Sequence, residues 1–141
     1  MPPDPVLSLS ARTGLDGLAE AQARIAAHLT ALGASVPMLN RVALVVEEVV
    51  LNVGNHGHDT PGPHPVDIAL AQDAEGITLL IEDRARLFNP VSAALPERPT
   101  RLEEAEPGGL GLMLVRQMAD ELRHDAREGG GNRLTVRLRE R

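Results

Sequence analysis

The feature that most constrains the fold of this chain is a segment, residues 37–54, whose side chains are apolar around most of a helical circumference. A helix with this pattern is buried on most of its sides, so it has to lie against another layer of secondary structure. Its apolar positions are Leu39, Val42, Ala43, Val45, Val46, Val49, Val50 and Val53. The segment therefore predicts a central helix packed on a sheet or on other helices.

The polar residues of this predicted helix are gathered on one narrow edge. At about 100° per residue, Glu48, Asn52 and Asn55 fall within roughly 60° of one another, whereas Glu47 points about 100° away from Glu48. Because buried polar groups must find partners, this edge indicates a binding site. An exposed seam with hydrogen bonds between residues four apart would give the same pattern, and this alternative remains open at this point.

Shorter periodic segments around this helix define the fold class. Apolar residues at helical spacing from Leu15 to Leu29 predict a first helix that ends at Gly33, and a third helix is expected at 110–122. Alternating or β-branched runs predict strands at residues 6–10, 66–70, 77–81, 123–127 and 134–138. Successive strands are joined by turns rather than by crossover helices. We therefore expect an α+β protein, a two-layer α/β sandwich with a mixed, mostly antiparallel sheet and helices on one face.

The composition indicates one domain, residues 1–141, with a Pro-rich and flexible stretch at residues 1–5. All 14 basic residues are Arg, and the absence of Lys and Cys excludes a Walker A lysine, Schiff-base chemistry, disulfides and thiol nucleophiles. A net charge of −6 and a single aromatic residue, Phe88, argue against a nucleic-acid or anionic-membrane surface. With no signal-peptide pattern and no apolar run near about 18 residues, we expect a cytoplasmic protein.

Two loops carry further candidate residues. Gly108-Gly109-Leu110-Gly111-Leu112 leads into the third predicted helix, and glycine backbone at a helix N-terminus offers unpaired N–H groups to an anion such as phosphate. His56, His58 and His64 lie close together in a Gly- and Pro-rich loop. We interpret them as solvent-facing, because a metal site would need further ligands at defined geometry and no Cys can supply them.

Three motifs occur in the order found in one superfamily: Glu48-x-x-x-Asn52 on the central helix, Asp83 at a strand end, and Gly108-Gly109-Leu110-Gly111-Leu112 opening a later helix. They resemble the N box, G1 box and G2 box of the gyrase and histidine-kinase type ATPases, whose nucleotide site is called the Bergerat fold. The small size, the acidic N-box residue and the Gly-Gly-Leu-Gly-Leu-x-Leu-Val form of the last box are similar to anti-sigma factor serine kinases. The resemblance covers roughly residues 5–139.

This resemblance implies an ATP- and Mg²⁺-dependent serine protein kinase that acts as an anti-sigma regulatory factor. Such proteins phosphorylate an anti-sigma-antagonist protein and bind a sigma factor, often as homodimers. The resemblance implies Glu48 as the catalytic base, Asn52 as the Mg²⁺ ligand, Asp83 as the partner of the adenine amino group, and residues 84–107 as the G1 turn and ATP lid. The implied cofactor-binding residues are Asn52, Asn55, Asp83, Ala85, Phe88, Gly108, Gly109, Leu110, Gly111, Leu112 and Thr135.

The G1 box departs from the family pattern, which usually reads Asp-x-Gly-x-Gly or Asp-x-Gly-x-Pro. Ala85 and Leu87 stand at its special positions, and Ala at a positive φ would cost on the order of 1 kcal/mol relative to Gly. A non-catalytic protein-binding module of the same fold, with weak or no nucleotide binding, is therefore an alternative. Arg84 and Arg86 either contact a phosphate or a partner's acid, or are simply solvated. A histidine-kinase domain acting in trans ranks last, since only a lone His28 lies on the first helix and no phosphoacceptor helix pair is evident.

Overall fold

The computed structural model describes residues 7–60, 62–89 and 109–140. The elements of this part of the chain are β1 (Leu7–Arg12), α1 (Leu15–Ala31), α2 (Val36–His56), β2 (Pro65–Gln72), β3 (Gly76–Asp83), α3 (Gly109–Met118), β4 (Glu121–Ala126) and β5 (Asn132–Arg139). Every helix and strand expected from the sequence is present in the expected order. The flexible stretch expected at residues 1–5 lies outside the described residues, and so do residues 90–107 of the expected G1 turn and ATP lid.

The strands form one sheet in the order β1-β2-β3-β5-β4. Each neighbouring pair is antiparallel, so the described sheet has no parallel component, although a mixed sheet was expected. Strands β3 and β5 are paired so that Asp83, the last residue of β3, lies opposite Asn132, the first residue of β5. This register joins two positions that are almost fifty residues apart in the chain.

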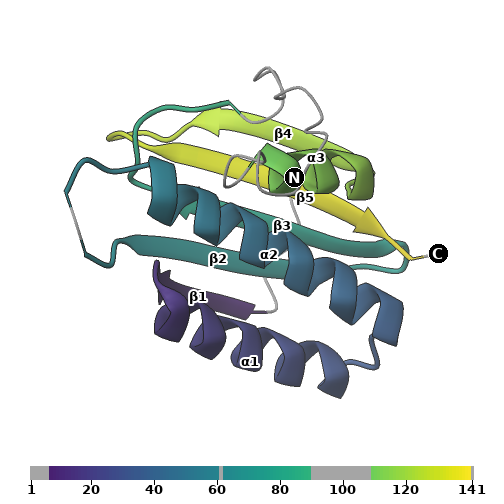
Figure 1. The fold of residues 1–141 in the computed structure, drawn as a ribbon. Helices are drawn as coiled ribbons and strands as arrows, with labels where there is room; N and C mark the ends of the chain where they lie inside the picture. The colour runs from purple at the N-terminus through teal and green to yellow at the C-terminus, as the bar shows by residue number, and fades with distance from the viewer. Residues whose placement is uncertain (1–6, 61, 90–108, 141) are drawn as a thin grey trace.

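All three described helices cover one face of the sheet, with α2 crossing it between α1 and α3 (Figure 1). Alternate strand residues point into this layer, among them Ile77, Leu79 and Ile81 of β3 and Leu134, Val136 and Leu138 of β5. Helix α2 contributes Val42, Val45, Val46 and Val50 to the same core, each at most 1% exposed. The two-layer α+β sandwich with helices on one face is therefore confirmed, and α2 is its central helix.

The opposite face of the sheet carries the other set of alternating residues: Asp67, Ala69, Thr78, Leu80, Glu82, Arg133, Thr135 and Arg137. We call this the open face, because no described helix covers it (Figure 1). Among the described residues, no helix combines the length and the apolar character needed to cross a bilayer.

Two element boundaries show how local chemistry sets the ends of helices. Ser35 precedes α2 and its Oγ accepts a hydrogen bond from the Met38 N–H at 3.2 Å, as expected for a helix cap. Helix α3 ends at Met118, so its predicted extension to residue 122 is wrong. The reason is pairing with β5: the Asp120 N–H donates to the Arg137 carbonyl at 2.8 Å, and Leu122 lies opposite Val136 as a strand residue.

Candidate functional site

The polar edge of α2 faces α3. At about 100° per residue, Arg41, Glu48 and Asn52 fall within roughly 40° of one another around the helix. Arg41 reaches the C-terminal end of α3, where its guanidinium donates to the Met118 carbonyl and pairs with Asp120, both at 3.2 Å. Because Arg41 marks the side of α2 that α3 occupies, Glu48 and Asn52 lie on that side as well.

Helices α2 and α3 run antiparallel to each other (Figure 1). At about 1.5 Å per residue, Asn52 lies ~17 Å along α2 from Arg41, and Gly109 lies ~14 Å along α3 from Met118. Asn52 is therefore level with the start of α3, the helix that Gly109 opens. Gly108 and the side chains of residues 109–112 are outside the described part of the chain, so the phosphate contacts expected of the glycine-rich box stay a prediction.

The side chains of Glu48 and Asn52 are half-buried, and neither hydrogen-bonds another described residue. The alternative of a seam stabilised by hydrogen bonds between Glu48 and Asn52 thus has no support in the described residues. Burial raises the pKa of Glu48 above its ordinary value, and the negative charge of Glu47 raises it further. A carboxylate with a raised pKa is a stronger proton acceptor when ionised, which suits a general base.

Asp83 lies at the end of β3, on the helix side of the sheet, and is only 6% exposed. Its Oδ1 accepts a hydrogen bond from the Ala85 N–H at 2.9 Å and a second from Asn132 Nδ2 at 3.0 Å. Both hydrogen bonds that described residues donate to this carboxylate end on Oδ1. The second oxygen, Oδ2, is therefore left to accept a hydrogen bond from a ligand.

Asn132 is a site residue that the sequence did not reveal. It precedes the strand expected at residues 134–138, whereas the structure places it at the start of β5, 7% exposed and bonded to Asp83. Its Nδ2 also donates to the Arg86 carbonyl at 2.9 Å, and its Oδ1 accepts from the Phe88 N–H at 2.9 Å. Asn132 thus holds both the carboxylate and the loop of residues 84–88, which we call the G1 loop. Only the pairing of β3 with β5 could have shown this.

The G1 loop is also held from the C-terminal end of α2. The Arg86 N–H donates to the Gly57 carbonyl at 3.0 Å, and a Cβ added to Gly57 would lie 2.6 Å from the Cβ of Ala85. No non-glycine residue in the described ranges has a positive φ, so the strain considered for Ala85 does not arise. Its methyl group is buried against Gly57 instead, because the missing side chain of that glycine leaves the space.

The other predicted cofactor-binding residues are placed differently. Phe88 donates a hydrogen bond from its backbone N–H to Asn132, and the residue is 40% exposed at the end of the G1 loop. Asn55 is exposed near the end of α2. Thr135 lies on the open face opposite Leu80, since its strand neighbours Leu134 and Val136 point into the core. The structure therefore brings Asp83, Ala85 and Phe88 together beside the end of α2, and separates Thr135 from them by the thickness of the sheet.

The histidine-containing loop lies beside Asp83. His58 and His64 stack face to face with ring centroids 3.7 Å apart and planes 7° apart, and both are half-buried, so the solvent-facing expectation is wrong for these two. Burial lowers the pKa of His58, the positive charge of His64 adds to this, and the Asp83 carboxylate partly opposes it. Stacked rings cannot direct two nitrogens at one ion, and no group of three metal-ligating side chains occurs among the described residues.

The two arginines next to Asp83 are both exposed, and one of them is paired. Arg86 forms an ion pair with Asp59 in the same loop as the stacked histidines. This contact adds a link between the G1 loop and the segment after α2. Since both side chains of the pair are largely solvated, it contributes little to stability.

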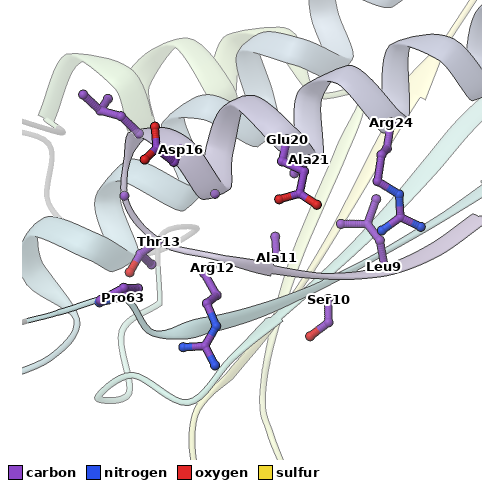
Figure 2. A pocket seen from close by; sticks show the side chains of 13 residues that line it. Leu9, Ser10, Ala11, Arg12, Thr13, Asp16, Glu20, Ala21, Arg24 and Pro63 are labelled. Atoms are coloured by element: carbon purple, nitrogen blue, oxygen red, sulfur yellow. The ribbon is translucent and has the colours of Figure 1, made fainter.

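A cavity of about 520 Å³ lies elsewhere, between β1 and the start of α1. Figure 2 shows Glu20 and Arg24 pointing from α1 toward β1, and Arg12 and Asp16 lie toward the turn that joins β1 to α1. None of the predicted site residues lines it. The cavity belongs to the outer edge of the sheet and is separate from the site around Asp83.

Comparison with known proteins decides the family. The model of the histidine kinase-like ATPase domain matches residues 12–138. The chain belongs to this family. Membership in an ATPase domain family implies ATP binding.

Three relatives indicate which histidine kinase-like ATPases are similar. The chain is 32% identical over 96 residues to the serine/threonine-protein kinase BtrW of Bordetella bronchiseptica. This match spans 67% of the present chain and 66% of BtrW, which is just under two thirds of the length of BtrW. Anti-sigma F factors of Clostridium beijerinckii and Clostridium novyi are 23% and 26% identical over 117 residues, 83% of this chain and 82% of each relative. These names support an anti-sigma regulatory, kinase-like branch of the family.

Proposed function

We propose that this chain is an ATP- and Mg²⁺-dependent serine protein kinase and an anti-sigma regulatory factor. In this proposal it phosphorylates a serine of an anti-sigma-antagonist protein and binds a sigma factor. The observation that carries the proposal is the pair Glu48 and Asn52, half-buried and without protein partners in the described residues, on the side of α2 that faces the glycine-opened helix α3. The names of the kinase and anti-sigma relatives agree with it.

Each residue has a chemical role in this proposal. Asp83 Oδ2 accepts a hydrogen bond from the adenine amino group. The backbone N–H groups of Gly109, Leu110 and Gly111 donate hydrogen bonds to the phosphates. Asn52 would supply an uncharged oxygen to Mg²⁺, and the ion would offset the negative charge of the phosphates. The Glu48 carboxylate takes the proton from the substrate serine hydroxyl while that oxygen forms a bond to the γ-phosphorus and the bond to the β–γ bridging oxygen breaks. The products are phosphoserine and ADP.

Donor chemistry supports the assignment of Asn52 to Mg²⁺. Mg²⁺ prefers oxygen ligands, keeps several waters and is usually held through one or two protein oxygens plus phosphates. An amide oxygen that has no hydrogen-bond donor among the described residues fits that requirement, and the nearby Glu48 carboxylate would remain ionised beside a divalent cation.

The test is transfer of radiolabel from the γ-phosphate of ATP to a purified anti-sigma-antagonist protein. Glu48→Gln should reduce the rate by about 100-fold or more, the usual contribution of a general base, while MgADP affinity stays within about threefold of wild type. The matched control is Glu47→Gln, because Glu47 is exposed and points away from Glu48. Equal label transfer by wild type and Glu48→Gln would rule out the base assignment.

A second candidate is a non-catalytic module that holds a partner protein. It is favoured by Leu87, which replaces a glycine or proline of the usual G1 box and is 66% exposed beside the exposed Phe88. Calorimetry with MgATP separates the two candidates, because the kinase proposal requires binding. A dissociation constant in the micromolar range would count strongly against the non-catalytic module.

A further inference from the structure

The side-chain amide of Asn132 uses all four of its hydrogen-bonding positions within the protein. Three of them go to Asp83, Arg86 and Phe88, as described above. The fourth is filled from the neighbouring strand, where His124 Nε2 lies 2.8 Å from Asn132 Oδ1. A buried amide that loses one partner leaves a polar atom unsatisfied, so each of these contacts affects the whole group.

The partners of Asn132 also determine which way its amide points. Two of its neighbours, Asp83 Oδ1 and the Arg86 carbonyl, are acceptors, and the Phe88 N–H is a donor. A flipped amide would bring oxygen against two oxygens and an NH₂ group against an N–H. The amide therefore has the orientation seen in the structure, in which Oδ1 faces His124 and can only accept a hydrogen bond from it. The imidazole therefore carries a hydrogen on Nε2.

His124 is suited to this contact by its place in the sheet. It lies on β4 opposite Leu134, so it is the diagonal neighbour of Asn132 on the helix-facing side. Asn132 is its only hydrogen-bond partner among the described residues. Within the described residues, the His124 imidazole therefore stabilises the position of the Asn132 amide, and this amide in turn donates a hydrogen bond to Asp83.

We propose that His124 is a positioning residue of the nucleotide site, and that it acts through Asn132 on the Asp83 carboxylate and on the G1 loop. The inference rests on the proposed nucleotide binding. In the absence of the His124 donor, Asn132 Oδ1 keeps only the Phe88 N–H, and the amide can rotate away from Asp83 and Arg86. Asp83 Oδ2, the oxygen proposed to accept a hydrogen bond from adenine, is then no longer held in one orientation. His124 has this effect without contacting the nucleotide itself.

The first measurement uses the nucleotide-free protein. Amide hydrogen exchange should show about tenfold less protection of the Phe88 N–H in His124→Phe, with core amides such as that of Leu79 unchanged, because only the loop is released. His124→Gln keeps a side-chain N–H donor and should restore protection. Wild type should also show a slowly exchanging His124 Nε2–H resonance that disappears in Asn132→Ala. A matched control is Arg123→Gln, since Arg123 is exposed on the same strand and pairs with Asp125.

The second measurement is MgADP affinity by calorimetry. His124→Phe should weaken binding by about five- to tenfold, the usual effect of one buried hydrogen bond, while His124→Gln and Arg123→Gln stay within about twofold of wild type. Unchanged Phe88 protection and unchanged affinity in His124→Phe would overturn the positioning role, and so would an equal loss of protection in core amides. A wild-type protein that does not bind MgADP would instead overturn the proposed function, and the Phe88 exchange would then decide separately whether His124 holds the loop.

Discussion

Replacing Asp83 by Asn tests the proposed adenine contact with little change of shape. In the wild type, Oδ1 accepts from the Ala85 N–H and from Asn132, and Oδ2 receives no hydrogen bond from described residues. An Asn side chain can keep its oxygen toward these two donors. Its NH₂ group then takes the place of Oδ2, so a donor faces the amino group of adenine, which is also a donor.

The expected magnitude follows from this exchange of atoms. Loss of a hydrogen bond to a charged group removes about 1.5–3 kcal/mol, which corresponds to an approximately 10- to 140-fold weaker affinity for MgADP. The two internal hydrogen bonds on Oδ1 become neutral, which should lower the free energy of unfolding by about 1–2 kcal/mol and the melting temperature by about 3–7 °C. The fold itself should remain.

Calorimetry with ADP and with inosine diphosphate is the deciding assay, because hypoxanthine carries a carbonyl oxygen where adenine has its amino group. Wild type should prefer ADP, and Asp83→Asn should lose or reverse this preference, since its NH₂ group can donate to the carbonyl. Asp67→Asn is the control, because Asp67 is bonded to Ser10 on the open face of the sheet. The reasoning would be refuted by undiminished ADP binding in Asp83→Asn, or by an equal weakening for both nucleotides.

Two further predictions concern the supports of the G1 loop. Gly57→Ala places a methyl group 2.6 Å from the Ala85 Cβ and 2.7 Å from the Val53 carbonyl oxygen, and should lower the free energy of unfolding by about 1–3 kcal/mol in urea denaturation. Ala85→Gly in the same chain should recover part of this loss, and simple additivity would contradict the contact. Burial and the charge of His64 lower the pKa of His58 in the folded protein, so the unfolded chain binds a proton at this histidine more readily. The free energy of unfolding should therefore fall as the pH decreases from above 6.5, the ordinary pKa, through the lowered pKa of the folded state. The melting temperature of wild type should drop more between about pH 7.5 and about pH 5 than that of His58→Phe, which keeps the stacked ring; parallel curves would exclude His58 as the cause.

The elements of this fold could be predicted because their signals are local. The valines of α2 recur at helical spacing, and the alternation of residues 77–81 and 134–138 specifies strands with one buried face. The polar edge with Glu48 and Asn52 follows from the same 3.6-residue period. Even the cap at Ser35 is a local preference. The family resemblance then supplied roles for these positions.

What the tertiary structure alone decided is which residues meet. Asn132 contacts Asp83, and His124 contacts Asn132, because β5 pairs with β3 and β4 in one register. Gly57 leaves space for the Ala85 methyl group because α2 ends beside the G1 loop. The same register put Thr135, expected at the nucleotide, on the open face. A shift of one residue would reverse the face of every side chain in the strand, and no local pattern around residues 129–132 specifies that shift. Burial of Leu134, Val136 and Leu138 against the helices selects the register, and with it the site.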